Sequence, residues 1–283
     1  MCSRSPTSTT PAPDSTSTPV PDWLRRLAAC PPAFDDEIPP GFERLLDERL
    51  CVLFGPNGIF ANVYPFRLDD VPAVVEEVRA AARGRRAKRL HWNIGPDAEP
   101  RDLSPRLRTL GLVDDDPTTA LVLQREPPRV ESVEARPVRS IGELRLAAEI
   151  AHEAFGDPPD RLQAVLENLR EEWEQREGRG SRTFLAFVDG EPVGAARSVY
   201  FEGHLVLLVS GGVLPGARGR GAYRALVRAR WEDAVQRGTP ILLVFGGPMS
   251  RPILERSGFQ PIFDLEVLTD ELGAELVGGR QGE

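Results

Sequence analysis

The residues with the clearest chemical potential form a glycine-rich stretch at 213–227, where an apolar run passes through a turn into a helical pattern. Glycines stand at 216, 219 and 221. Glycine lets successive backbone N–H groups point inward, and a following helix adds unpaired N–H groups and the positive end of its dipole. The stretch is therefore typical of a cradle for a phosphorylated ligand.

Two common phosphate loops are disfavoured by the residues that follow these glycines. Gly216 and Gly221 have the spacing of a nucleotide-triphosphatase loop, but Ala222–Tyr223 stand where Lys and Ser/Thr must hold phosphates and magnesium. A dinucleotide fingerprint through Gly219 would need a third glycine at the position of Arg224. Nucleotide binding or kinase activity is accordingly disfavoured, and a plain basic turn before a solvated helix is the alternative to a ligand cradle.

The pattern that remains is Arg/Gln-x-x-Gly-x-Gly/Ala after Val-x-Pro, which the chain carries at 213–215 and 218–221. It resembles the acyl-coenzyme A motif of the GNAT superfamily of N-acetyltransferases, except that Tyr223 stands where the family has Gly or Ala. The resemblance implies acetyl-CoA as co-substrate, with the pantetheine arm on the strand and the pyrophosphate on the loop amides. The implied cofactor-binding residues are Val213, Leu214, Pro215, Arg218, Gly219, Arg220, Gly221, Ala222 and Tyr223.

The elements around the loop agree with this resemblance. The apolar run 241–245 reads as a buried strand, and Ser250 to Phe259 resembles the family's second motif, a short helix ending in Gly-Phe. Upstream, a capping box at Ser140 predicts a helix from Ile141 that ends at Gly156. A second helix is expected from 160 to 173, and the Asp-Gly pair at 189–190 predicts a hairpin. From 132 the predicted order is β-α-α-β-β-β-α-β-α-β, the order of a GNAT domain.

The first half of the chain gives a shorter version of the same order. Patterns between 51 and 123 predict β-β-α-β-α-β, but the segment 64–70 holds no glycine where the cradle would lie. We therefore expect a GNAT-type mixed, largely antiparallel sheet flanked by helices, preceded by a smaller α/β half domain; an unrelated small α/β domain is the alternative. The predicted divisions are a disordered tail (1–21), a degenerate GNAT-like domain (22–128), a GNAT acetyltransferase domain (130–270) and a flexible tail (271–283).

The residues that would move protons are less clear than the loop. Attack of an amine on a thioester needs a general base and a general acid, and the resemblance places the acid, a Tyr, at the position of Leu254. Leucine cannot donate a proton, and Pro248 replaces an Asn often found in the family's second motif. Candidates for the base are Ser210, Glu202 and the His152–Glu153 pair. The resemblance also implies that strand N–H groups at Val213 and Leu214 polarise the thioester carbonyl.

Composition narrows the classes of partner. Lys+Arg 35 against Asp+Glu 43 gives a net charge of −8, which argues against a general nucleic-acid binder. Three scattered cysteines and three scattered histidines form neither a disulfide framework nor a metal motif, so we expect no metal and a cytoplasmic location. No apolar run approaches the roughly 18 residues of a membrane helix, so no membrane contact is expected. A homodimer is left open.

The leading prediction is an N-acetyltransferase that moves an acetyl or other acyl group from acetyl-CoA to a primary amine of a small molecule or peptide. The alternative is a non-catalytic sensor or interaction protein that binds acyl-CoA, suggested by Leu254 and by the degenerate first half. The identity of the amine acceptor is not encoded in any motif.

Overall fold

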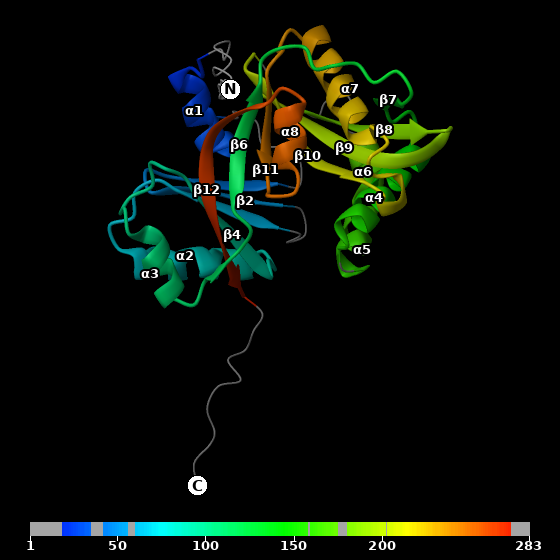
Figure 1. Cartoon of the computed structure of the whole chain (residues 1–283). Coiled ribbons are helices and arrows are strands. Elements are labelled where there is room, and N and C mark those ends of the chain that lie inside the picture. Colours follow the sequence, from blue (N-terminus) through cyan, green and yellow to red (C-terminus); the bar gives the residue numbers. More distant parts are fainter. Residues whose placement is uncertain are drawn as a thin grey trace, which may run out of the picture.

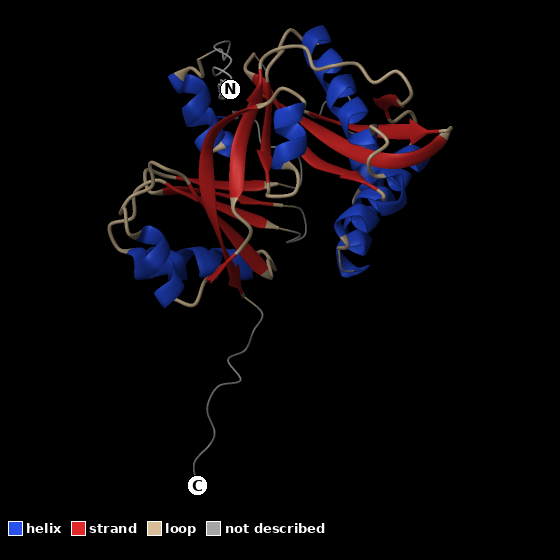
Figure 2. Ribbon diagram, in the orientation of Figure 1, coloured by secondary structure: helices blue, strands red, loops and turns tan. Residues whose placement is uncertain are grey.

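The computed structural model describes residues 19–34, 42–55, 60–157, 159–174, 180–201 and 203–272, so most of both predicted tails lies outside it. Its strands form one sheet flanked by helices on both faces (Figures 1 and 2). The strands are β1 (Glu43–Leu46), β2 (Leu50–Phe54), β3 (Ala61–Pro65), β4 (Arg89–Ile94), β5 (Val113–Asp114), β6 (Thr118–Leu123), β7 (Glu134–Pro137), β8 (Ser181–Val188), β9 (Glu191–Phe201), β10 (Leu205–Val213), β11 (Leu242–Gly246) and β12 (Gln260–Glu271). The helices are α1 (Asp22–Ala29), α2 (Val71–Gly84), α3 (Leu103–Thr109), α4 (Ile141–Phe155), α5 (Pro159–Glu167), α6 (Leu169–Glu174), α7 (Ala222–Gln236) and α8 (Arg251–Arg256).

The predicted fold class is confirmed. Among the described strand pairs, β3 with β4 and β10 with β11 are parallel, and the other pairs are antiparallel. Local signals acted as expected: Ser140 Oγ accepts from the N–H of Glu143 at 3.1 Å, and α4 ends at Gly156 in the left-handed region. The turn at Asp189 and Gly190 has φ of 54° and 83°, as a tight hairpin requires.

One predicted helix is two. The apolar spacing from 160 to 173 predicted a single helix, but α5 ends at Glu167 and α6 begins at Leu169. Between them the Asn168 side chain donates to the carbonyl of Ala164 at 2.8 Å. Asparagine competes for backbone hydrogen bonds in this way, and the break lets α5 and α6 turn around the cavity described below.

The two halves of the chain exchange their last strands. The sheet order is β1-β2-β3-β4-β12-β6-β11-β10-β9-β8-β7, so β6 from the first half lies beside β11 of the second. In return β12 runs from β6 to β4, pairing first over 260–265 and then over 266–271 (Figure 1). The predicted boundary near residue 129 therefore separates two parts of the sequence, but the sheet is built from strands of both parts.

Apart from the exchange, the halves follow one plan. The order β2-β3-α2-β4-α3 has the same strand directions as β9-β10-α7-β11-α8. The helix starts differ, however. Asp70 caps α2 with its own carboxylate, which accepts from the N–H of Ala73 at 3.1 Å, whereas Gly221 at the start of α7 provides no side-chain cap. An anion site at the helix N-terminus is thus filled from within in the first half and left uncapped in the second.

Around β6 and β8 to β12, the core is divided between the two faces of the sheet. α7 and α8 pack on one face, with Leu226, Trp231 and Leu254 among the buried side chains. α4 and α1 pack on the other face, with Ile150 and Leu24. α2 and α3 belong to a separate cluster with β2, β3 and β4. No helix among the described residues is long and apolar enough to cross a membrane.

Two cysteines that are far apart in the sequence lie together. Cys30 and Cys51 are buried free thiols, and a hydrogen bond joins them. Burial, with that hydrogen bond, raises the pKa of Cys30 far above its ordinary value. The described residues contain no group of three or more His, Cys, Asp or Glu side chains arranged to hold a metal ion.

Candidate active site

The site is built around a bulge in β10. β10 pairs in parallel with β11 from Val206 to Leu208, and its register with β9 shifts between Val209 and Gly212. Inside the bulge Ser210 has φ of 50°, in the left-handed region that L-residues rarely adopt. We call residues 209–213 the divergent segment, because here β10 is no longer paired with β11. Bulges re-aim strands next to active sites, and strained residues gather there.

The backbone just after the divergent segment corrects one predicted role. The N–H of Leu214 donates to the carbonyl of Val193 on β9 at 2.9 Å, so it is not free to polarise a ligand carbonyl. Neighbouring residues of a strand point their N–H groups to opposite sides. Val213 therefore directs its N–H away from β9, toward the side on which β11 has separated, and its predicted role stays a prediction.

The glycine-rich loop has the form expected of an anion cradle. A 3₁₀ turn at Pro215–Ala217 leads to Gly219 and Gly221, whose φ values of 79° and 91° suit glycine. Arg218 already donates its N–H to the carbonyl of Pro215 at 3.3 Å. The first N–H groups of α7 receive no side-chain cap, which is the condition for an anion to bind there.

The loop arginines are occupied by protein contacts. Arg218 donates to the carbonyl of Val213 at 3.3 Å and to that of Ala154 at 3.1 Å, and so fastens the loop to the end of α4. Arg220 forms an ion pair with Asp189 at 2.5 Å on the exposed hairpin turn. These contacts position the loop and leave its backbone N–H groups as the predicted anion donors.

Tyr223 points inward rather than into the loop. A Cβ added at Gly211 would lie 3.2 Å from the Tyr223 ring, which packs with the clusters beneath α7. Burial raises the pKa of Tyr223 above its ordinary value. Leu254 is fully buried against Gly246, so α8 presents no proton donor at the position where the family resemblance implied one.

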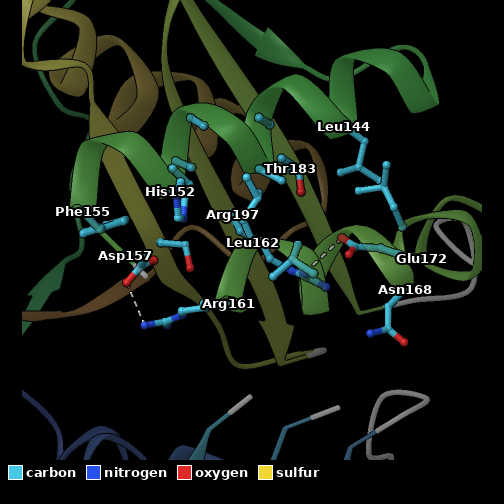
Figure 3. A pocket seen from close by; sticks show the side chains of 18 of the residues that line it. Leu144, His152, Phe155, Asp157, Arg161, Leu162, Asn168, Glu172, Thr183 and Arg197 are labelled. Carbon is cyan, nitrogen blue, oxygen red and sulfur yellow. Dashed lines mark hydrogen bonds and ion pairs between the residues drawn. The ribbon is translucent and has the colours of Figure 1, made fainter. Parts of the chain in front are cut away.

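A cavity of about 620 Å³ lies on the opposite face of the sheet, among α4, α5, α6 and strands β8 to β10 (Figure 3). Most of its lining is apolar or aromatic, and it includes Phe42 and Phe60 from the first half of the chain. Its charges are largely paired: Arg161 bonds to Asp157 at 2.9 Å, and Arg197 bonds to Glu172 at 3.0 Å. The remaining lining residues are Leu144, Ala147, Ala148, Ala151, His152, Phe155, Leu162, Val165, Asn168, Leu169, Glu171, Thr183, Ala195, Ala196 and Ser210.

The structure separates the candidate bases. Ser210 and His152 line the cavity, and His152 projects from α4 with a buried Nδ1 that has no hydrogen-bond partner (Figure 3). Glu153 is exposed and is not among the lining residues, because one residue along a helix turns the side chain by about 100°. Glu202 lies outside the described residues. Of the predicted pair at 152–153, His152 is therefore the residue that lines the cavity.

The close approach of α4 to the divergent segment depends on Gly212. A Cβ at this position would lie 2.8 Å from Cβ of Ala154, a distance that real side chains do not adopt. Gly212→Ala is therefore expected to lower the free energy of unfolding by about 1–3 kcal/mol, measured by denaturant titration. Gly84→Ala is the control, because a Cβ there meets nothing within 4 Å and stability should be unchanged or slightly raised. Equal stability of the two variants would contradict the close approach.

Comparisons with known proteins bear on the region just described. Residues 145–259 match the model of the acetyltransferase (GNAT) family. None of the curated proteins matches the sequence. The matched region begins in α4, includes the cavity helices, the divergent segment and the loop, and ends at Phe259 after α8.

Solved structures share the fold over most of the chain. A GCN5-related N-acetyltransferase from Kribbella flavida has 18% identity and a TM-score of 0.62 over 89% of this chain and 96% of that chain. Another from Sphaerobacter thermophilus has 17% identity and 0.56 over 89% and 85%. A tandem GNAT protein from the clavulanic acid biosynthesis pathway has 15% identity and 0.54 over 89% and 94%. The solved structures show that the fold extends over most of the chain. The family match shows that residues 145–259 form a domain of the GNAT acetyltransferase family.

Proposed function

We propose that the protein transfers an acetyl group from acetyl-CoA to a primary amine. The observation that carries this proposal is that the loop and the cavity meet at the divergent segment. Ser210, in the divergent segment, lines the cavity. Val213, at the end of the same segment, directs its N–H toward the side from which β11 has separated, and the loop follows directly after it. An acyl donor held by the loop and an acceptor held in the cavity would then meet at one place, as acyl transfer requires.

The residues of the loop fit the phosphates of such a donor. Acetyl-CoA, when bound, supplies an acyl group activated as a thioester. Gly219, Gly221 and the uncapped start of α7 offer backbone N–H groups for the pyrophosphate, and Val213 offers an N–H at the carbonyl. These contacts need no side-chain charge. This is consistent with the contacts of Arg218 to the Ala154 carbonyl and of Arg220 to Asp189.

The cavity favours an acceptor with an apolar or aromatic body. Its lining is dominated by aliphatic residues and the rings of Phe42 and Phe60, whose centroids are 5.8 Å apart. Its paired charges leave no strong field of one sign at Arg161 or Arg197. His152 is the group proposed to accept a proton from the attacking amine, since it brings an imidazole to the cavity lining.

We propose further that the first half is a degenerate, cofactor-free copy of the same domain. Its strand order and directions support this, and Asp70 caps the helix that would otherwise receive the phosphates. A carboxylate at that position repels an anion. Phe42 and Phe60 give the first half a share in the acceptor cavity of the second.

The loop assignment predicts the effect of Gly219→Asp. A carboxylate beside the pyrophosphate should abolish the rise in melting temperature caused by coenzyme A and raise its Kd at least about tenfold, a loss of roughly 1.4 kcal/mol of binding free energy. Gly111→Asp is the matched control, because Gly111 has φ of 91°, near the 79° of Gly219, and both face open space. The control should lose similar stability and keep the shift.

Release of thiol from acetyl-CoA across a panel of amines with aliphatic and aromatic bodies tests the reaction itself. Acceptor-dependent release by the wild-type protein is the expected result. Binding of coenzyme A without release from any amine would favour the alternative, a non-catalytic acyl-CoA-binding protein, for which Leu254 in place of a proton donor is the supporting observation.

A further inference from the structure

Arg230 on α7 is a buried cation without a counterion. Its side chain is 1% exposed, its Nε donates to the carbonyl of Leu226 at 3.1 Å, and both terminal nitrogens lack a hydrogen-bond partner. Burial lowers its pKa from the ordinary value. An unpaired buried guanidinium opposes folding, so its presence calls for an explanation in function.

Four other ionisable side chains on or beneath α7 are bonded to one another: Asp233, Tyr200, Arg237 and Arg182. The carboxylate of Asp233 accepts from the Tyr200 hydroxyl at 2.5 Å, from Arg237 at 3.1 Å and from Arg182. None of these hydrogen bonds involves Arg230. The hydroxyl of Ser198 on β9 is buried and also lacks a partner.

Arg230 and Tyr223 meet at the divergent segment. A Cβ at Gly211 would lie 3.2 Å from the Tyr223 ring and 3.7 Å from a terminal nitrogen of Arg230. The guanidinium charge acts on the phenol, although neither terminal nitrogen has hydrogen-bond geometry. A phenol and a cation thus lie against the part of β10 from which β11 has separated.

We propose that Tyr223 is the general acid of the reaction and that Arg230 stabilises the tyrosinate it leaves. The inference rests on the proposed acyl transfer, and it assigns to the start of α7 the proton donation that Leu254 on α8 cannot perform. Tyr223 is thereby a catalytic residue that meets the leaving sulfur. Arg230 acts through Tyr223 as a positioning residue.

The step balances without any further reactant. As the amine nitrogen bonds to the acyl carbon, the carbon–sulfur bond breaks and its electron pair goes to sulfur. Tyr223 gives the proton of its hydroxyl to that sulfur, forming coenzyme A thiol, and the resulting tyrosinate regains a proton from solvent. The amine loses one proton to His152, which passes it to solvent, so one proton is released and one is taken up.

Two features of the surroundings of Tyr223, its burial and the nearby Arg230 guanidinium, suit this role. Burial holds the phenol protonated through the neutral range, so that it is ready to donate. The adjacent guanidinium favours the charged phenolate once the proton has left. The same charge would stabilise a thiolate on coenzyme A, which gives a readout that is independent of turnover.

Tyr223→Phe tests the proposal, with Tyr200→Phe as the control because Tyr200 is also buried beneath α7. Phenylalanine keeps the ring that packs against Gly211. We expect kcat of Tyr223→Phe to fall at least about tenfold with the KM for acetyl-CoA unchanged. Bound coenzyme A, followed by its ultraviolet thiolate absorbance, should ionise at higher pH in Tyr223→Phe than in the wild type. Tyr200→Phe should leave both unchanged.

Arg230→Met adds a readout that a structural role would not give. Removing an unpaired buried charge should raise the melting temperature, while kcat falls and the bound thiol again ionises at higher pH. Wild-type turnover by Tyr223→Phe, or a thiol titration that neither substitution moves, overturns the proposal while acyl transfer stands. Failure of coenzyme A to bind the wild type removes both the proposed function and this inference.

Discussion

A chain cut between Glu131 and Ser132 is expected to remain one folded particle, because the two fragments hold each other's last strand. β6 of the first fragment lies between β11 and β12 of the second, and β12 reaches β4 of the first. A protease site inserted at this exposed position and cleaved should leave the elution volume in size-exclusion chromatography and the unfolding midpoint close to those of the uncut chain.

The second fragment expressed alone should fail to fold cooperatively. It would lack Leu121 and Leu123, which belong to the core beneath α7 and α8, and Val122, which packs on the opposite face. Each buried side chain of this size contributes about 1.5–3 kcal/mol, so the loss is comparable with the roughly 5–15 kcal/mol that stabilises an ordinary domain. A soluble 132–283 fragment with a cooperative thermal transition would show that the strand exchange is dispensable.

The strands were predictable from local pattern, but their exchange was not. Apolar runs at 119–123 and 241–245 mark buried strands, and the structure places β6 and β11 there. The pairing partner of each strand depends on residues far apart in the sequence. β6 and β12 could each pair with strands of either half, and no local residue specifies which. α1 was not predicted, although Leu24 and Leu27 have helical spacing and are almost fully buried.

The candidate site shows the same division between local and long-range information. The loop was predicted from the spacing of its glycines after Val-x-Pro, and Gly219 and Gly221 have the positive φ that glycine permits. The position of Leu214 in the β9 ladder depends on a bulge at Ser210 that no pattern announces. The inward direction of Tyr223 likewise follows from the packing of α7 on the sheet.

Loss of the His152 imidazole is expected to remove most of the transfer activity while leaving donor binding intact. His152 lines the acceptor cavity, and its imidazole is a group that can take the proton of the attacking amine. General base catalysis contributes about 10²–10⁴-fold, and His152→Ala should lower kcat by a factor in this range. The rise in melting temperature caused by coenzyme A should persist, because the loop lies on the other side of the divergent segment.

Chemical rescue separates a catalytic His152 from a structural one. The alanine variant leaves space beside a cavity of about 620 Å³, so imidazole added to the buffer should enter and restore part of kcat in proportion to its concentration. Glu153→Gln is the matched control, since Glu153 is its exposed neighbour on α4 and should retain full activity. Full activity of His152→Ala would contradict the prediction and would indicate that Ser210 or water is the general base. Activity lost without rescue, together with a lower melting temperature, would assign His152 to the packing of α4.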